Sequence, residues 1–337
     1  MTLRLPVAFL ALLAASGASA LTETRSTVLG PGTVRGAFLS RGTSPRAGGM
    51  GEAFAAVADD VSAVGWNPAG LGQLESFGAV ASWDGAGQGL GLSHLAVAAP
   101  VGPGTLGASL TAMTYGSFTS YNDLGDRLGS EGFMDLGVTA AWGMSVGRLM
   151  GHPAWGGVSA EFVRDAAGGT MAGFGAGALL PLGPIFRVGA SVQHLGTTSG
   201  GFSLPGRARV GLAAKLGNGL FAGVEGAYGF QDKLGTMALG LEWLPVRLLA
   251  VRAGYRQPFR TQRLEGLTGL TAGVGVKWRS LGVDYAFQPY GDLAVSHRVG
   301  LTWTAPAAVP VQSTPDAGKE PAVATEPAPA AAPATPR

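Results

Sequence analysis

The sequence predicts an all-β fold: a transmembrane antiparallel β-barrel of about 14 strands with a short N-terminal plug, or hatch, in its lumen. Three observations support this. Only 13% of the 337 residues are charged and 46% are hydrophobic, whereas a soluble protein has a charged share of about 25%. Apolar and polar residues alternate with period two in many segments of about ten residues. Beyond residue 20 no apolar run reaches about 18 residues, so spanning helices are not expected.

The first 20 residues have the layout of a secretory signal peptide. Arg4 supplies a positive start, residues 5–15 form an apolar core, and small residues occupy positions 18–20. Such a core is too short to span a bilayer. We expect cleavage before Leu21 and export to the outer membrane of a Gram-negative bacterium. The alternative is a buried N-terminal helix, which the polar run at residues 22–27 disfavours.

Residues 21–74 contain a glycine-rich and alanine-rich stretch at residues 44–71, SPRAGGMGEAFAAVADDVSAVGWNPAGL. Asn67 before Pro68 predicts a helix start, because Asn caps free backbone N–H groups and Pro fits the first helical position. Asp59 or Asp60 would cap a shorter turn in the same way. A compact segment of this kind cannot cross the bilayer, so we expect it to fold into the lumen as the plug.

Residues 75–304 are expected to form the barrel, since the alternation recurs there from segment to segment. In residues 208–216 every second residue is apolar, and Arg207, Arg209 and Lys215 belong to the opposite set. One face of such a strand suits outer-membrane lipid and the other a polar lumen, and aromatic residues often stand at segment ends. A sheet in lipid leaves no edge unpaired, so we expect closure.

The strand count follows from the segment starts. These lie near residues 75, 89, 104, 132, 154, 171, 185, 206, 219, 236, 248, 267, 281 and 296. An even number of strands is usual in single-chain bacterial barrels. Longer connections are expected at residues 116–131 and 257–266, on the extracellular side. A soluble β-sandwich or propeller would also alternate, but it would need a more charged outer face.

The N-terminal motif resembles the signature of the PorV/PorQ family, barrels similar to the FadL-type transporters of hydrophobic compounds. The matching residues are Arg46-Ala47, Gly49-Met50-Gly51, the Ala-rich residues 53–58, Asp59-Asp60 and Trp66-Asn67-Pro68-Ala69-Gly70-Leu71. Residues 285–303 also resemble the last two strands of that family. The middle of the chain shows only the general strand pattern of the family and none of its motifs.

The resemblance implies passage of hydrophobic small molecules across the outer membrane. In FadL-like proteins an Asn-Pro-Ala motif lies in a plug that moves during transport, and Asn67, Pro68 and Ala69 take that place here. A fixed cap whose motif serves only folding is the alternative to a movable plug. Two other functions stay open: a PorV-like component that binds or shuttles secreted cargo protein in type IX secretion, and a purely structural barrel.

Charged residues on the polar strand faces are candidates for contacts in the lumen. They are Arg187, Arg207, Arg209, Glu225, Glu242, Arg252, Arg256, Lys277, Arg279, Asp284 and Arg298. Such groups can bind a carboxylate through charge-assisted hydrogen bonds. More often they pair with one another and with the plug, so no single ligand residue is chosen.

Several function classes are not expected: an enzyme, a cofactor or metal protein, and a nucleic-acid binder. The chain has no cysteine, its net charge is +2, and its four histidines are scattered. It lacks the basic stripe that follows phosphates. Gly143-Met144-Ser145-Val146-Gly147 matches the nucleophile pattern G-x-S-x-G, but it lies within an expected strand, whereas that motif needs a strand-to-helix turn.

Residues 305–337 are rich in Ala and Pro, which predicts a disordered tail. A plug before the first strand would leave both chain ends in the periplasm. We therefore expect a periplasmic tail, either as a spacer toward a periplasmic partner or as an inert extension.

Overall fold

The computed structural model describes residues 34–85, 87, 89–197, 202–259, 268–291 and 294–306. The expected signal peptide, almost all of the expected tail and most of the expected connection at residues 257–266 lie outside these ranges.

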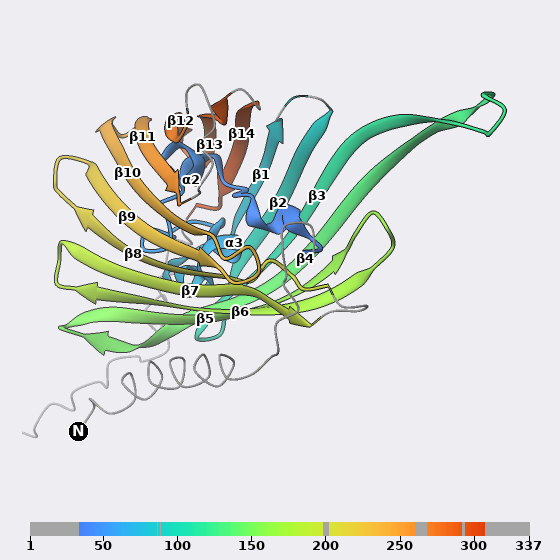
Figure 1. Cartoon of the computed structure of the whole chain (residues 1–337). Coiled ribbons are helices and arrows are strands. Elements are labelled where there is room, and N and C mark those ends of the chain that lie inside the picture. The colour runs from blue at the N-terminus through green and yellow to red at the C-terminus, as the bar shows by residue number, and fades with distance from the viewer. Residues whose placement is uncertain are drawn as a thin grey trace, which may run out of the picture. The chain divides into compact units, whose positions relative to one another are not determined.

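In the described part of the chain, fourteen strands form one closed antiparallel barrel, which confirms the predicted fold (Figure 1). The strands are β1 Gly78–Gly85, β2 Leu90–Val101, β3 Gly104–Tyr121, β4 Arg127–Leu149, β5 His152–Arg164, β6 Thr170–Leu182, β7 Phe186–Thr197, β8 Arg207–Lys215, β9 Leu220–Gly229, β10 Gly235–Val246, β11 Leu249–Pro258, β12 Leu270–Trp278, β13 Leu281–Pro289 and β14 Val295–Thr304. Each strand pairs with its neighbours in sequence, and β1 pairs with β14 to close the sheet. None of the described helices is long and apolar enough to cross a membrane.

The strand faces follow the predicted alternation. On β10 the apolar Leu239, Leu241 and Trp243 are about half exposed on the outside, at 48%, 49% and 50%, whereas Ala238 and Glu242 point inward and are only 4% and 3% exposed. An apolar outer belt is what lipid requires, because a charge there would lose its hydration.

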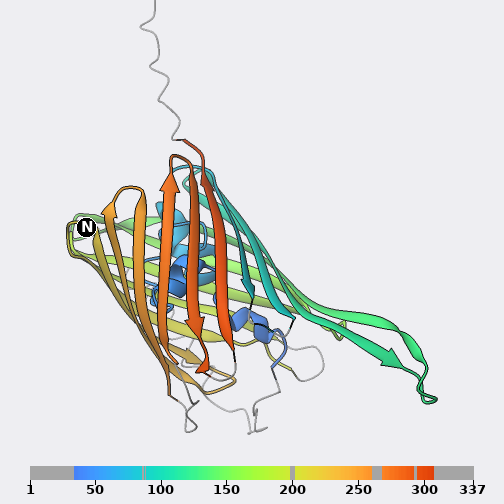
Figure 2. The same cartoon turned by 90° about the horizontal axis from the view of Figure 1, so that it is seen from above.

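The barrel has two different ends. At the turn end, where β1 begins and β14 stops, most strand connections are two to four residues, such as Arg247 and Leu248 between β10 and β11. At the opposite, loop end the chain forms its longer connections and a long β3–β4 hairpin that projects beyond the other strands (Figure 2). Short periplasmic turns and longer extracellular loops are usual in such barrels.

The β3–β4 hairpin corrects the expected loop at residues 116–131. The ladder continues through Ser117 paired with Gly132 to Tyr121 paired with Arg127, after an irregularity beyond Thr114. Thr, Phe and Tyr favour extended backbone, and the Asn122 side-chain oxygen accepts hydrogen bonds from the nitrogens of Leu124 and Asp126 to close the turn. The segment is therefore strand up to a short tip.

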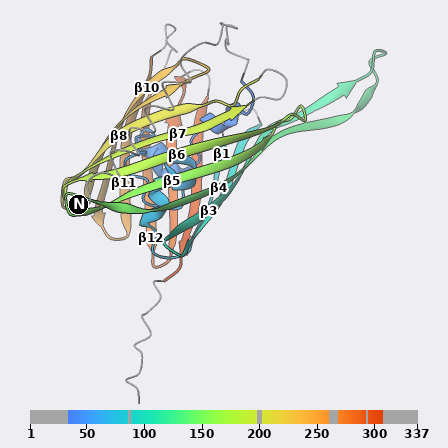
Figure 3. The same cartoon turned by 90° about the horizontal axis from the view of Figure 1, so that it is seen from below.

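Residues 34–74, here called the N-terminal segment, lie inside the ring of strands (Figure 3). They form the 3-10 helix η1 Ala37–Ser40, the helices α2 Pro45–Gly49 and α3 Ala63–Trp66, and the 3-10 helix η2 Pro68–Gln73. The nitrogen of Arg35 donates to Ser203 O (3.2 Å) at the loop end, and the segment leads to β1 at the turn end. It therefore runs the length of the lumen. The first described residue and the end of β14 lie at opposite ends of the barrel. The chain ends themselves, expected in the periplasm, lie outside the described residues.

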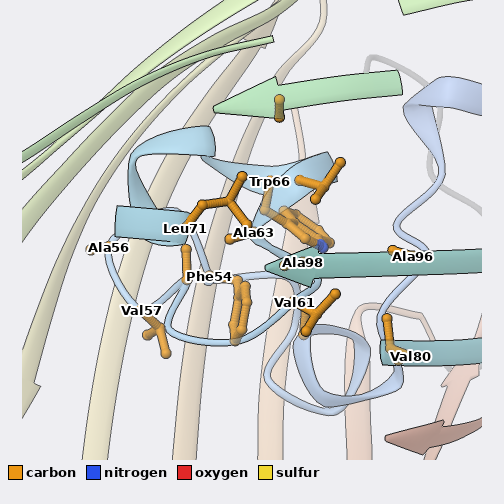
Figure 4. Packing of buried hydrophobic residues seen from close by; sticks show 14 of the residues in the cluster. Phe54, Ala56, Val57, Val61, Ala63, Trp66, Leu71, Val80, Ala96 and Ala98 are labelled. Carbon is orange, nitrogen blue, oxygen red and sulfur yellow. The ribbon is translucent and has the colours of Figure 1, made fainter. Parts of the chain in front are cut away.

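A hydrophobic core joins the N-terminal segment to the wall (Figure 4). Phe54 and Trp66 pack edge to face with ring centroids 6.1 Å apart, and the wall meets them with small residues such as Ala96 and Ala98. Glycine permits the closest approaches: a Cβ at Gly254 would collide with the backbone nitrogen of Gly51. The small residues of both partners therefore allow backbone-to-wall packing.

Candidate functional site

Arg46 joins the acidic pair of the N-terminal segment to the wall. Its guanidinium lies 2.5 Å from Asp59, 2.9 Å from Asp60 and 2.8 Å from Glu242 on β10. Burial alone would lower the pKa of Arg46, but these carboxylates outweigh it and raise the pKa well above its usual value. Glu242 also accepts from Arg252 on β11 (2.7 Å). Glu242 therefore binds the N-terminal segment, and Arg252 positions Glu242.

Glu52 is the centre of a second buried network. Its carboxylate lies 3.3 Å from Arg256 on β11 and 3.4 Å from Arg298 on β14. Burial alone would raise the pKa of Glu52, but the two guanidiniums outweigh it and hold the pKa below its usual range. Arg298 also donates to Asp84 on β1 (2.9 Å), which accepts from Arg41 (2.8 Å). Two points of the segment are thus linked through one arginine of the wall.

The Asn-Pro-Ala motif lies against β6. The Asn67 side-chain oxygen accepts from Ala69 N (3.2 Å), which caps η2 as expected, and Pro68 is the first residue of that helix. The Asn67 amide donates to Ala55 O (2.8 Å) and to Ala178 O (3.2 Å) in the wall. Asn67 and Ala69 are fully buried. The motif is therefore both a helix cap and a joint between segment and barrel.

The other motif residues serve packing and turns. Met50 is fully buried in the core, and Gly51 has a left-handed backbone (φ 64°) that suits glycine. Thr271 accepts from Gly51 N (2.9 Å) and donates to Gly49 O (3.2 Å). Asp60 accepts from Ser62 N (2.9 Å) at the start of α3, whereas Asp59 caps no helix among the described residues and pairs with Arg46.

A further group of inward charges meets the segment from β8 and β9. Glu225 accepts from the nitrogens of Phe54 (2.9 Å) and Ala55 (2.7 Å). Arg209 lies 3.6 Å from Glu225 and its guanidinium carbon is 4.9 Å from the centre of the Trp66 ring. Arg207 donates to Ser40 O (3.3 Å), so it reaches the loop-end part of the segment.

At the loop end the lumen contains a cluster of buried apolar side chains that the sequence motifs did not indicate, here called the apolar chamber. It is formed by inward residues of the wall and the chain before β8: Leu92, Met113, Val163, Met171 and Leu204, each at most 5% exposed. Phe38 of η1 packs into it and is 3% exposed. Gly137 on β4 provides room, since a Cβ there would lie 3.1 Å from the Phe38 ring. An aromatic side chain of the protein thus fills an apolar site.

A polar layer follows the apolar chamber in the direction of the turn end. On β2, Leu92 of the chamber is followed two residues later by His94, and on β5 the inward residue two positions before Val163 is Glu161. His94 Nδ1 is 2.8 Å from Thr111 Oγ1, and His194 Nδ1 is 2.8 Å from Glu161. A cavity of about 30 Å³ lies here, lined by Phe38, Arg41, Trp66, His94 and Arg209 among others.

Comparison with known proteins gives a fold rather than a family. No family model and no curated protein matches the sequence. The solved structures that are similar include the monoaromatic hydrocarbon channel CymD (TM-score 0.57, 15% identity, 78% of this chain and 98% of that one). They also include the toluene transporters TbuX of Ralstonia pickettii (0.54, 15%, 78% and 97%) and TodX of Pseudomonas putida (0.54, 12%, 78% and 97%). The chain shares the fold of these channels.

The neighbours that share this fold are named as transporters and channels. Ser145 of the G-x-S-x-G match lies within β4, and its hydroxyl has only backbone carbonyls as hydrogen-bond partners among the described residues. The described residues also include no group of three metal-ligating side chains.

At the turn end a second cavity of about 400 Å³ opens beside Arg46 and Asp60. Lys277 and Arg247 both line this cavity, and both are exposed. Arg279 is a correction to the predicted lumen charges: it is exposed in the turn after β12 and packs on Trp278, with its guanidinium carbon 5.2 Å from the ring centre. The predicted alternation ran past the last residue of the strand.

Proposed function

We propose that the protein passes small hydrophobic molecules through the outer membrane and that they enter the lumen from the loop end. The observation that carries the proposal is the apolar chamber with Phe38 inside it. Ligand sites for apolar molecules are concave and mostly apolar, and a benzyl side chain resembles the toluene of the neighbours' names. Phe38 in this proposal is an internal occupant that an incoming molecule displaces.

The proposal assigns the movement to one part of the N-terminal segment. Residues 36–43, here called the arm, carry Phe38 and begin at Gly36, which has a left-handed backbone (φ 66°). Residues 44–74, the body, are held by Arg46, Glu52, Phe54 and Asn67 through the contacts given above. The arm makes fewer polar contacts with the wall: Arg41 with Asp84, Ser82 with Thr43 O (2.6 Å) and Arg207 with Ser40 O (3.3 Å). In this proposal the arm is the movable gate and the body is the fixed cap, the two alternatives considered for the plug.

Uptake of labelled toluene by intact cells tests the function. We expect cells that make the wild-type protein to take up toluene several-fold faster than cells without it. Phe38→Ala should raise the rate further because it empties the chamber, and Phe38→Trp should lower it. Phe162→Ala, on the lipid-facing side of β5 and 53% exposed, is the matched control. Wild-type uptake equal to that of cells without the protein would reject the proposal.

A PorV-like role in secretion, with membership of the PorV/PorQ family, is the second candidate. The β3–β4 hairpin favours it, because Tyr121, Leu124 and Leu128 are 61%, 88% and 66% exposed at its tip, and exposed apolar groups often mark protein contacts. Replacing residues 117–132 by a short turn should then abolish co-purification of secreted proteins from outer membranes. Unchanged partners would remove this candidate.

The proposal also includes a cleaved signal peptide and a periplasmic tail. The intact mass of the protein from outer membranes should correspond to a chain that starts at Leu21. A protease added to the periplasm should shorten that chain at residues 305–337, whereas the same protease added outside intact cells should not.

A further inference from the structure

Two residues that line the cavity beneath the apolar chamber carry polar atoms that the protein itself does not satisfy. His94 is 6% exposed, and its Nε2 has no hydrogen-bond partner in the described part of the chain. The Nε of Arg41, from the arm, is also buried and lacks a partner there. Both residues line the cavity together with Phe38. A buried donor or acceptor without a partner is costly, so such atoms mark a place where a polar group is expected.

The distance between the two features suits a small molecule. Leu92 and His94 are two positions apart on the inward face of β2, and a strand rises about 3.3 Å per residue. The backbone positions of Leu92 and His94 are therefore roughly 7 Å apart, which is comparable with the length of an aromatic ring that carries a two-carbon chain. The same change from apolar to polar occurs between Met113 and Thr111 on β3, so neighbouring strands of the wall share it.

The arginines that line the cavity are already paired. Arg41 pairs with Asp84 and Arg209 with Glu225, and His194 is hydrogen-bonded to Glu161. A carboxylate placed here would add an uncompensated buried charge, which is unfavourable. A hydroxyl accepts from the Arg41 Nε–H and either donates to or accepts from His94 Nε2, whichever tautomer the ring adopts.

We propose, on the basis of the transport function proposed above, that the preferred ligand is an apolar molecule with a single hydroxyl head rather than a pure hydrocarbon. Its apolar body takes the place of the Phe38 ring, and its hydroxyl enters the cavity against His94. His94 is then the residue that determines specificity. A site with an unpaired polar atom rejects the analogue that lacks the matching group, because that analogue leaves the atom unsatisfied.

Equilibrium binding to the full mature Phe38→Ala protein in detergent tests this with three probes: ethylbenzene, 2-phenylethanol and phenylacetate. Adding His94→Leu should weaken 2-phenylethanol at least tenfold and change ethylbenzene less than twofold. His94→Gln, which keeps a donor and an acceptor, should restore most of the alcohol affinity. His297→Leu alters an outward, exposed histidine and should affect neither probe.

The outcomes separate this inference from the proposed function. If ethylbenzene binds and His94→Leu weakens both probes equally, or neither, the hydroxyl preference is wrong while the transport proposal stands. Phenylacetate binding more tightly than 2-phenylethanol would overturn the neutral head group. If none of the probes binds, the chamber is no ligand site and both proposals fail.

Discussion

Asn67 shows how one side chain joins the N-terminal segment to the barrel. Its amide satisfies two backbone carbonyls, one in the segment and one in β6, while its oxygen caps η2. We expect Asn67→Ala to lower the free energy of unfolding by about 2 kcal/mol or more, because it removes a cap and leaves buried carbonyls unpaired. Urea unfolding in lipid vesicles measures this. Asn218→Gly is the control, since Asn218 lies in an exposed turn with φ 48°. Equal stability of the two variants would contradict the role of Asn67.

Glu52 makes the attachment of the segment sensitive to acid. Because Arg256 and Arg298 hold its pKa below the ordinary value of a glutamate, about 4.3, the folded state binds its proton less readily than the unfolded state. Its contribution to stability is therefore complete above that ordinary pKa and is lost as pH falls through the lower, folded pKa. Glu52→Gln should cost about 3 kcal/mol at neutral pH and flatten the stability profile below pH 4. If the difference in stability between the wild type and Glu52→Gln already disappeared between pH 8 and pH 6, the lowered pKa of Glu52 would be contradicted.

At the scale of elements, the arm and the body of the N-terminal segment are expected to behave differently. A Cβ at Gly223 on β9 would lie 3.7 Å from the Cβ of Ala53 in the body, a separation that suits a disulfide. The chain has no native cysteine, so Ala53→Cys with Gly223→Cys creates a single tether. We expect the oxidised variant to keep at least half of the wild-type toluene uptake, because only the arm has to move. Uptake that stops on oxidation and returns on reduction would mean that the body moves as well.

The β3–β4 hairpin and Arg279 show the limits of reading elements from a sequence. Alternation identifies a strand wherever one face contacts lipid and the other faces the lumen. The expected start of β4, residue 132, therefore differs from the observed start, residue 127, by only five residues. Beyond the membrane that demand ends, so residues 117–121, which mix Ser and Thr with Phe118 and Tyr121, do not show the alternation although they continue a ladder. The same pattern does not mark the strand's last residue, so Arg279 was assigned to the lumen although it belongs to a turn.

For the whole molecule, the barrel was predictable and the candidate site was not. The fold depends on a repeated local pattern and on closure, both of which can be recognised along the chain. The site depends on which residues meet across the lumen: Arg46 and Glu242 are 196 positions apart. Phe38 lies outside the recognised motif, and Leu92 and Met113 resemble outward residues until the register shows that they face inward. His94 gains its significance only from the cavity that it lines.

The N-terminal segment makes the two ends of the barrel different, and cysteine labelling can establish which end faces the outside of the cell. Leu124, 88% exposed, marks the tip of the β3–β4 hairpin at the loop end, and Arg247 is exposed in a turn at the other end. If the loop end is extracellular, a membrane-impermeant maleimide should label Leu124→Cys in intact cells, and Arg247→Cys several-fold more after permeabilisation than before. The cysteine-free wild type provides the blank. The reverse pattern would put the arm and its Phe38 chamber on the periplasmic side. The chamber would then be the exit of the channel, and the proposed order of entry would have to be inverted.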